Sequence, residues 1–370
     1  MSLPTITIPP RRPTARIERF DTVVVGAGQA GLAVGHQLAS RDVDFVIVDG
    51  DARVGDSWRR RWDSLRLFTP ARRSGLPGMP FPAAPDHLPD KDEVADYLER
   101  YAERFDLPLR MRTRVRTLGA DGDRFVIATG GTRLEAASVV VATGAFQRPH
   151  VPGLSWRLSH RIHQLHSSTY RNPFELPLGR VLVVGAGNSG AQIAMELARF
   201  RPVWLAGRDT GYTPRRVLGR DVFDWTWPLL TRLTTDTRLG RRMRDRAGAA
   251  GDSLVGITDA DLAAAGVRRV GRVTDVRDGL PVCDGETLAP AVVIWCTGFT
   301  ADYSWIDLPV MDARGRPRHR RGVATDVEGL YFVGQRWQHR RTSSLIGGVG
   351  ADAEWIAGQV AARSEAMALA

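Results

Sequence analysis

The residues of this chain with the most informative spacing are three glycines and an acid that follows them. Gly26, Gly28 and Gly31 form a GxGxxG pattern directly after the apolar run Thr22–Val25, and Asp49 ends the next apolar run. In such a pattern the first glycine permits a tight turn, the second lets the backbone approach a pyrophosphate, and the third lets a helix pack closely on a strand. The acid accepts hydrogen bonds from a ribose. We predict a dinucleotide site here, with a purely structural glycine turn as the alternative.

The same chemistry is repeated later in the chain. A second GxGxxG pattern follows another apolar run and consists of Gly185, Gly187 and Gly190. Asn188 and Ser189 can add hydrogen bonds at the start of the following helix, and Arg208 stands where the first unit has Asp49. An arginine attracts a 2′-phosphate that an acid would repel, so this site favours NADPH over NADH. A solvated surface arginine is the alternative.

Strands and helices must position these motifs, and the hydrophobic periodicity predicts both. Short runs of β-branched residues predict buried strands over 22–25, 45–48, 138–144, 180–184 and 203–206, and helices are expected over 30–40, 92–104 and 191–200. A strand, a glycine loop, a helix and a second strand in that order are typical of a parallel sheet with crossover helices. The predicted fold class is α/β, with two Rossmann-like dinucleotide-binding domains.

The segment after Asp49 resembles a known family. Gly55–Trp58, Trp62–Leu67 and Leu76–Pro82 are similar to the stretch that wraps the flavin ring in flavin-containing monooxygenases, closest to the bacterial and plant branch with the indole-pyruvate monooxygenases. The resemblance implies an NADPH domain inserted into an FAD domain. We expect a loose arm over 1–20, an FAD domain formed by 21–152 and 297–363, and an NADPH domain over 153–296.

The resemblance also implies which residues hold the cofactors. For FAD they are Trp58, Arg66 and Leu67 near the flavin, the backbone of Val115 at the adenine, Thr143 and Gly144 at the end of the first domain part, and Gly334 and Gln335 beside the sugar chain. Many flavoproteins have an acid where this chain has Gln335. Thr297 and Gly298 would close the NADPH domain. Family members often carry an asparagine near the flavin, but Phe68–Pro70 occupy that place, so no catalytic side chain is assigned.

One further motif is only half present. Leu165–Tyr170 resembles the end of a fingerprint of the same family, but His160 and Ile162 stand where its first half has phenylalanine and glycine. His166 is therefore expected either to couple the two domains or to be an ordinary hydrogen-bonded surface histidine.

The composition narrows the remaining classes of function. The formal charge of +10 comes from scattered arginines, since Lys91 is the only lysine, and this distribution argues against nucleic-acid binding. Cys283 and Cys296 form no CxxC pair, so neither a metal site nor an adjacent redox dithiol is expected. Without a secretory signal or a long apolar run, we expect a cytoplasmic protein without stable membrane insertion. Segment 212–250 either covers the substrate route or is a solvated helical insertion.

Together these features predict an NADPH-dependent FAD monooxygenase that acts on a small organic substrate. The resemblance implies that O₂ reacts through a C4a-hydroperoxyflavin, so the flavin carries the chemistry and the protein positions it and excludes water. A reductase that passes NADPH electrons to a protein or metal partner without inserting oxygen is the alternative. A dinucleotide sensor without catalysis is the third class. The substrate and the oligomeric state are not predicted.

Overall fold

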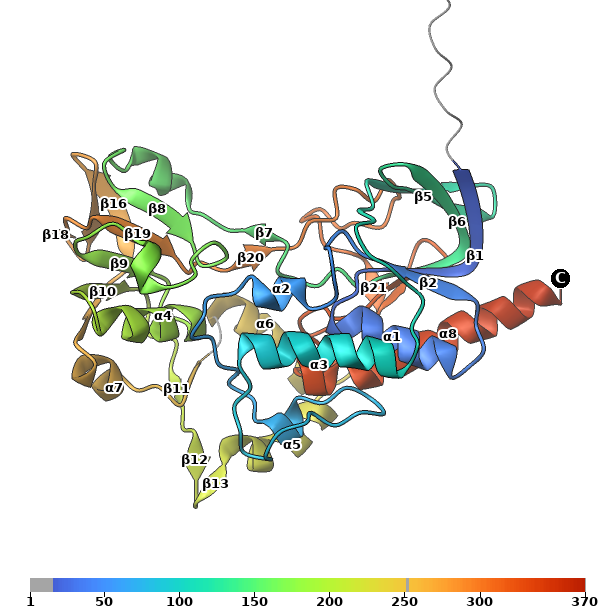
Figure 1. The fold of residues 1–370 in the computed structure, drawn as a ribbon, viewed down its shortest axis with the longest axis horizontal. Coiled ribbons are helices and arrows are strands. Elements are labelled where there is room, and N and C mark those ends of the chain that lie inside the picture. Colours follow the sequence, from blue (N-terminus) through green and yellow to red (C-terminus); the bar gives the residue numbers. More distant parts are fainter. Residues whose placement is uncertain (1–15, 251–252, 370) are drawn as a thin grey trace, which may run out of the picture.

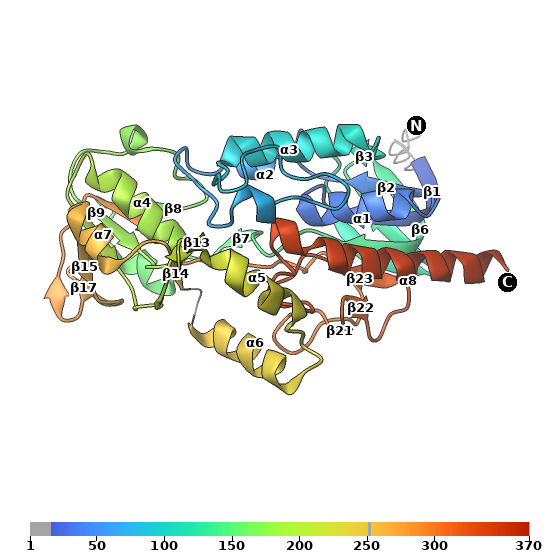
Figure 2. The ribbon, with the colours of Figure 1, turned by 90° about the horizontal axis from the view of Figure 1, so that it is seen from below.

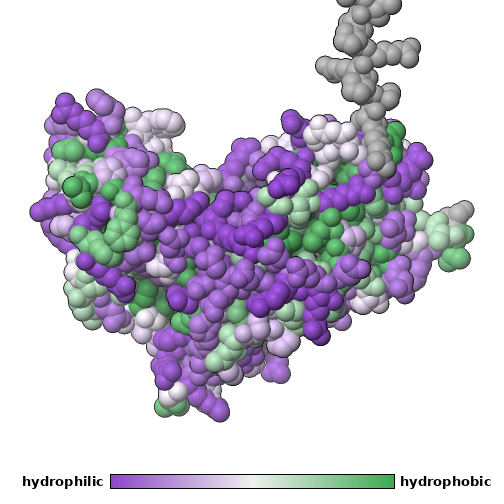
Figure 3. All heavy atoms as spheres, in the orientation of Figure 1, coloured by the Kyte–Doolittle hydropathy of each residue, from purple (hydrophilic) through white to green (hydrophobic). Residues whose placement is uncertain are grey.

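A computed structural model describes residues 16–250 and 253–369 of the chain. Two separate sheets form two lobes, and a pair of connecting segments joins the lobes (Figure 1). On the face shown in Figure 3, hydrophilic side chains dominate the waist between the lobes. The arrangement confirms the predicted α/β class with two dinucleotide-binding units.

The first sheet contains nine strands in the main order β21-β22-β23-β6-β1-β2-β3, and β5 links β4 to β6. Its strands are β1 (Arg16–Val25), β2 (Phe45–Val48), β3 (Leu109–Arg110), β4 (Thr117–Asp121), β5 (Arg124–Ala128), β6 (Thr132–Val141), β21 (His319–Arg320), β22 (Val323–Ala324) and β23 (Leu330–Phe332). β1 runs parallel to both β2 and β6, as expected for crossover connections. Val24 and Ile47 face one buried cluster, whereas Val23 and Val46 face the other. The apolar runs therefore form strands that are buried on both faces.

Three helices cover one face of this sheet, namely α1 (Gln29–Ala39), α3 (Lys91–Arg104) and α8 (Gly350–Ala368). The start of α3 is fixed by a capping box in which Asp90 accepts from the Glu93 amide and the Glu93 side chain accepts from the Asp90 amide. From the same helix, Tyr97 donates to the carbonyl oxygen of Met79 at 2.6 Å. α3 thus holds in place the loop Leu76–Pro82, which is part of the segment that resembles the flavin-containing monooxygenases.

The second sheet is parallel throughout, with the order β15-β10-β9-β19-β8. Its strands are β8 (His163–His166), β9 (Val181–Val184), β10 (Val203–Ala206), β15 (Val267–Val270) and β19 (Val292–Trp295). Helices α4 (Asn188–Ala198) and α7 (Asp259–Ala264) contribute to the cluster on one face. A small sheet contributes to the cluster on the other face, with strands β16 (Val273–Arg277), β17 (Leu280–Cys283) and β18 (Glu286–Thr287).

The segment 212–255 leaves the second sheet and is mostly helical. It comprises β11 (Tyr212–Thr213), β12 (Arg216–Val217), β13 (Arg220–Asp221), α5 (Val222–Arg232), α6 (Arg238–Ala250) and β14 (Leu254–Val255). Trp227 of α5 is buried against the rest of the molecule, whereas α6 lies at the edge of the molecule when it is seen from below (Figure 2).

The two lobes are joined where β7 (Arg148–Pro149) pairs antiparallel with β20 (Phe299–Thr300). The chain therefore leaves the first lobe and returns to it along adjacent strands. Five short helices complete the described elements: α2 (Asp56–Arg59), η1 (Ala71–Arg73), η2 (Gly153–Arg157), η3 (Pro173–Glu175) and η4 (Ile346–Gly348).

The structure corrects three predicted boundaries. Part of the expected arm belongs to the sheet, because residues 16–20 extend β1 along the long strand β6 and Arg19 pairs with Glu135 at 3.0 Å. Residues 1–15 lie outside the described residues. The strand predicted over 138–144 is the last part of β6 and ends at Val141, and α8 continues past residue 363, the predicted end of the FAD domain, to Ala368.

Candidate dinucleotide sites

The three glycines of the first loop have different surroundings. Gly26 has a φ of +112°, and a Cβ there would lie 2.7 Å from the carbonyl oxygen of Ala142. A Cβ on Gly31 would overlap the carbonyl oxygen of Gly26, whereas a Cβ on Gly28 would meet no heavy atom within 4 Å. Two of the glycines are therefore required by the fold itself, whereas the side of Gly28 faces open space, as the approach of a ligand to its backbone would require.

The second loop repeats this geometry. Gly185 has a φ of +113° and packs against the carbonyl oxygen of Cys296, and a Cβ on Gly190 would overlap the carbonyl oxygen of Gly185. Gly187 again faces open space. Each loop is followed by a helix, α1 in the first lobe and α4 in the second. The N–H groups of the first turn of a helix have no partner within the helix, so each helix start adds hydrogen-bond donors beside its own glycine loop. Each lobe therefore offers one cradle for a dinucleotide phosphate.

The residues that end the second strand of each unit differ in charge. Asp49 Oδ2 accepts from the amide of Ala27 at 2.7 Å, and Oδ1 accepts from the amide of Asp51 at 2.8 Å. The carboxylate is thus held against the first glycine loop and keeps lone pairs for a further donor. Arg208 follows β10 on the second lobe and is exposed.

Asn188 has another role than the one predicted from its place at the helix start. Its Nδ2 donates to the carbonyl oxygen of Ser253 at 3.0 Å, and its Oδ1 accepts from the amide of Val255 at 3.0 Å. The amide therefore fastens the returning end of the insertion to α4. Ser189 beside it is half-buried.

The residues predicted to lie near the flavin are brought between the two lobes. Trp58 and Leu67 are half-buried, and both pack against buried clusters of both lobes. The main chain of Arg66 is fixed to α4, because its carbonyl accepts from Gln192 Nε2 at 3.0 Å. The Arg66 guanidinium lies 3.4 Å from Asp90 and 3.6 Å from Glu93, so it is paired with carboxylates at the start of α3.

The two connecting segments contain four more of the predicted residues. Gln147 ties them together, since its Nε2 donates to Thr143 Oγ1 at 2.9 Å and to the carbonyl of Gly144 at 2.7 Å, while its Oε1 accepts from the amide of Asp302 at 3.0 Å. The Thr297 hydroxyl donates to the carbonyl of His150. Like Gly28, Gly144 and Gly298 would place a Cβ in open space. These residues therefore line the junction between the lobes.

His166 couples the second lobe to this junction. Its Nδ1 accepts from the amide of Ser168 at 3.1 Å, so the proton of the neutral ring belongs on Nε2, which donates to the carbonyl of Gly298 at 3.0 Å. The ring is 6% exposed and meets Phe299 edge to face, with centroids 4.8 Å apart. Burial lowers the pKa of His166 below its ordinary value of 6.5. Of the two alternatives that the sequence left open, the coupling role fits.

The remaining predicted residues lie on the first lobe. Val115 is half-buried and packs on the outer cluster of the first sheet. Gly334 has a φ of +85°, and a Cβ there would lie 2.7 Å from the Cβ of Ala30, at the start of α1. Gln335 Oε1 lies 3.1 Å from His319 Nε2, while its Nε2 is buried without a protein partner.

Beyond Gln335, the structure reveals a group of buried polar atoms that sequence reasoning missed. The atoms without a hydrogen-bond partner are Gln335 Nε2, Gln338 Nε2, His339 Nδ1, Thr342 Oγ1 and both carboxyl oxygens of Asp352. Buried polar groups normally find partners in protein, water or a bound ligand. Together with the open sides of Gly28 and Gly187, these orphaned atoms fit polar cofactors. Burial also raises the pKa of the Asp352 carboxyl above its ordinary 3.8. The only sequence signal was an acid within a stretch of small and apolar residues at 346–353.

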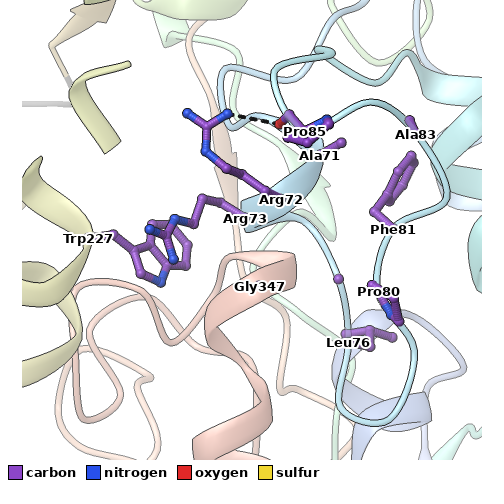
Figure 4. A pocket seen from close by; sticks show the side chains of 11 residues that line it. Ala71, Arg72, Arg73, Leu76, Pro80, Phe81, Ala83, Pro85, Trp227 and Gly347 are labelled. Atoms are coloured by element: carbon purple, nitrogen blue, oxygen red, sulfur yellow. Dashed lines mark hydrogen bonds between the residues drawn. The ribbon is translucent and has the colours of Figure 1, made fainter. Parts of the chain in front are cut away.

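A cavity of about 450 Å³ lies between η1, η4 and α5 (Figure 4). Leu76, Phe81 and Trp227 provide apolar surface. Arg72 donates twice to Asp224 at 2.9 Å, and the guanidinium of Arg73 lies 5.7 Å from the ring centroid of Trp227. The insertion therefore forms one wall of the cavity.

Metal-ligand clusters and membrane-spanning helices are both absent from the described part of the chain. No group of three or more metal-ligating side chains is found there. None of the described helices is both long and apolar enough to cross a membrane.

Comparisons with known proteins agree with this geometry. The pyridine nucleotide-disulphide oxidoreductase family matches residues 23–236. An uncharacterized CzcO-like oxidoreductase of Geobacillus kaustophilus is 44% identical over 341 residues, which cover 91% of this chain and 97% of that protein. Indole-3-pyruvate monooxygenase YUCCA4 of Oryza sativa subsp. japonica is 34% identical over 235 residues, covering 58% of this chain and 54% of the relative.

A solved structure resembles nearly the whole molecule. The flavin-containing monooxygenase from Stenotrophomonas maltophilia superposes with a TM-score of 0.77 at 28% identity, covering 93% of this chain and 99% of that protein. The resemblance predicted from the motifs between Gly55 and Pro82 is thus confirmed.

Proposed function

Because the chain belongs to the pyridine nucleotide-disulphide oxidoreductase family, we propose that this oxidoreductase is an FAD-dependent NADPH monooxygenase acting on a small organic substrate. The observation that carries the proposal is the pair of glycine loops, one on each lobe, with Trp58 and Leu67 packed between the lobes. The similarity to the monooxygenase from Stenotrophomonas maltophilia supports it.

In this proposal the first lobe holds FAD and the second holds NADPH. The proposed FAD contacts are Gly26, Gly28, Gly31, Asp49, Trp58, Arg66, Leu67, Val115, Thr143, Gly144, Gly334 and Gln335. The proposed NADPH contacts are Gly185, Gly187, Ser189, Gly190, Arg208, Thr297 and Gly298, with Asn188 supporting the loop. The chemistry that a bound flavin would supply is hydride uptake from NADPH followed by reaction with O₂. Because the Asn188 amide is already engaged, its contribution is to shape the loop rather than to bind directly.

The protein itself contributes position and exclusion of water. Trp58, Leu67 and the connecting segments close the junction at which the two cofactors would meet. The cavity beside η4 is the proposed substrate chamber, with Trp227 of the insertion as its wall. No side chain is assigned as acid or base.

A second candidate function is electron transfer without oxygen insertion. The cysteines give it little support, since Cys283 and Cys296 are both free thiols. Burial raises the pKa of Cys283 to about 11 and that of Cys296 to about 12, so neither forms the reactive thiolate at neutral pH. A reductase of this kind would have to pass electrons to an external acceptor.

The stoichiometry of the reaction tests the proposal. A monooxygenase consumes one NADPH, one proton and one O₂ for each oxygenated product and each water. We expect purified protein reconstituted with FAD, in a screen of small nucleophiles and ketones, to give one product that contains a single ¹⁸O atom from ¹⁸O₂. Products without ¹⁸O, together with reduction of an added ferredoxin, would replace this function with the reductase.

A further inference from the structure

Helix α6 has little packing support from the rest of the described structure. Over 238–246, the part of α6 whose side chains are described, only Gly240 is buried. Figure 2 shows α6 along the outer edge of the molecule. A helix of this length is marginal in water without packing against a partner. α6 therefore presents a face that is available for an external surface.

The exposed face of α6 is amphipathic and strongly cationic. Leu239 is 60% exposed and Met243 is 37% exposed, and their spacing places them on one side of the helix. The arginines of this stretch are Arg238, Arg241, Arg242, Arg244 and Arg246. Its single acid is Asp245, which pairs with Arg244 at 3.0 Å. Two exposed apolar side chains thus stand among cations that are largely uncompensated within the helix.

The helix is nevertheless firmly attached at its start. The amide of Thr235 donates to the carbonyl of His339 at 2.8 Å, and His339 Nε2 lies 3.0 Å from Asp236 Oδ2. Arg241 donates to the carbonyl oxygen of Thr235 at 3.0 Å. The residues just before α6 therefore attach it to the body, while the helix itself remains exposed.

The neighbouring helix extends the same chemistry. Trp225 and Leu229 lie four residues apart on α5 and are 49% and 62% exposed. The whole segment 212–250 carries nine arginines and four aspartates, so it accounts for half of the formal charge of +10. Apolar and cationic surface is thus concentrated in the insertion.

We propose that α6 docks peripherally on a membrane surface that contains anionic lipid. Basic residues beside a short apolar stripe are the composition of helices that lie in the plane of the lipid headgroups. A second copy of the chain fits less well, because two faces with this excess of arginine repel each other. A nucleic acid would use the arginines but gives no place to Leu239 and Met243.

Vesicle binding by the FAD-reconstituted protein tests this docking without NADPH or substrate. We expect the protein to float with vesicles of phosphatidylcholine and phosphatidylglycerol at a ratio of about 7:3, and not with pure phosphatidylcholine vesicles. Each arginine near an anionic surface contributes about fivefold in affinity, so Arg242→Ser with Arg246→Ser should weaken binding roughly twenty-fivefold. Leu239→Ser with Met243→Ser should also abolish most of the binding.

Matched controls separate this site from the general positive charge. Phe174→Ser with Leu178→Ser removes two side chains that are 78% and 91% exposed on the second lobe, and it should bind vesicles like the wild type. Arg161→Ser with Arg314→Ser removes the same charge from other exposed positions and should also bind normally. Bound FAD per chain reports folding for every variant.

Two results would overturn the proposal. One is wild-type binding that is absent, or that is equal on neutral vesicles and unchanged in 0.5 M salt (about the strength that screens such contacts). This measurement needs no variant and remains decisive if a substitution prevents folding. The other is a wild-type dimer that Leu239→Ser with Met243→Ser converts to a monomer, which would identify the face as a contact between copies.

Discussion

At the scale of single residues, Gly187 and Gly190 stand three positions apart but meet different surroundings. A methyl group on Gly187 meets open space, whereas one on Gly190 overlaps backbone. Gly187→Ala should leave thermal stability unchanged and weaken NADP⁺ binding about tenfold or more, which corresponds to ~1.4 kcal/mol. Gly190→Ala should destabilise the protein by about 1–3 kcal/mol. Thermal unfolding and calorimetric titration measure both, and equal loss of stability in the two variants would contradict the assigned roles.

Arg208 should decide between the two nicotinamide cofactors. A hydrogen bond to a charged phosphate contributes roughly 1.5–3 kcal/mol, so Arg208→Gln should lower kcat/KM for NADPH about ten- to a hundredfold and barely change it for NADH. Arg216→Gln is a control, since that residue is also exposed in the same lobe. Arg215 is already paired with Asp221 at 2.7 Å. If only Arg216→Gln changes the ratio, the phosphate is read from the insertion instead.

The close backbone packing at the first and third glycine of each loop could be predicted from the residue types alone, because it is local to one loop. Residue types did not predict Asp352, whose complete burial depends on how α8 packs against segments far away in the chain. Asn188 shows the same limit, since its amide is engaged by residues 253–255, which return to α4 only after the whole insertion.

At the scale of elements, α8 holds a carboxyl group whose pKa is raised by burial. The native state keeps this proton at pH values where the unfolded chain has lost it. The stability that the neutral acid contributes is complete below 3.8 and is lost as the pH rises through the folded pKa.

Asp352→Asn should therefore gain stability relative to the wild type between pH 5 and pH 8, by about 1.4 kcal/mol for each pH unit that separates pH 5 from the folded pKa. Urea unfolding at the two pH values measures it. Asp261→Asn on α7 should show no such change between pH 5 and pH 8, since hydrogen bonds from Thr258 lower the pKa of Asp261 and the stability it contributes is lost only as the pH falls below 3.8. A wild-type curve parallel to that of Asp352→Asn would mean that the carboxyl is ionised throughout.

Helices and strands with a clear hydrophobic period were predicted well. Elements whose bounds depend on partners far away in the chain were not. α1, α4 and the strands over 22–25 and 45–48 follow from local sequence. The start of β1 at Arg16 depends on the length of β6, which lies more than a hundred residues away. In the insertion, Pro228 lies inside α5 and the arginines mask any apolar stripe, so neither of its helices could be bounded.

At the scale of the whole molecule, Gln147 should set how firmly the lobes are held together. Gln147→Leu removes three hydrogen bonds, of which the one from the Asp302 amide joins the two connecting segments. We expect KM for NADPH to rise about three- to tenfold, on the order of 1 kcal/mol, with bound FAD unchanged. Gln164→Leu is the matched control, because its bonds to Ser155 and Trp295 lie within the second lobe. Loss of FAD in Gln147→Leu would show that the residue supports the first lobe alone.

The pairing of β7 with β20 has a consequence for engineering the gene. Pro149 and Phe299 are neighbours on adjacent strands, so the chain enters and leaves the second lobe at adjacent positions. Neither buried cluster of the first sheet includes a residue between 153 and 296. A short turn could therefore replace that entire stretch, and a foreign module with neighbouring termini could be spliced in at the same point. The first lobe is in this respect a scaffold in which the inserted domain can be exchanged.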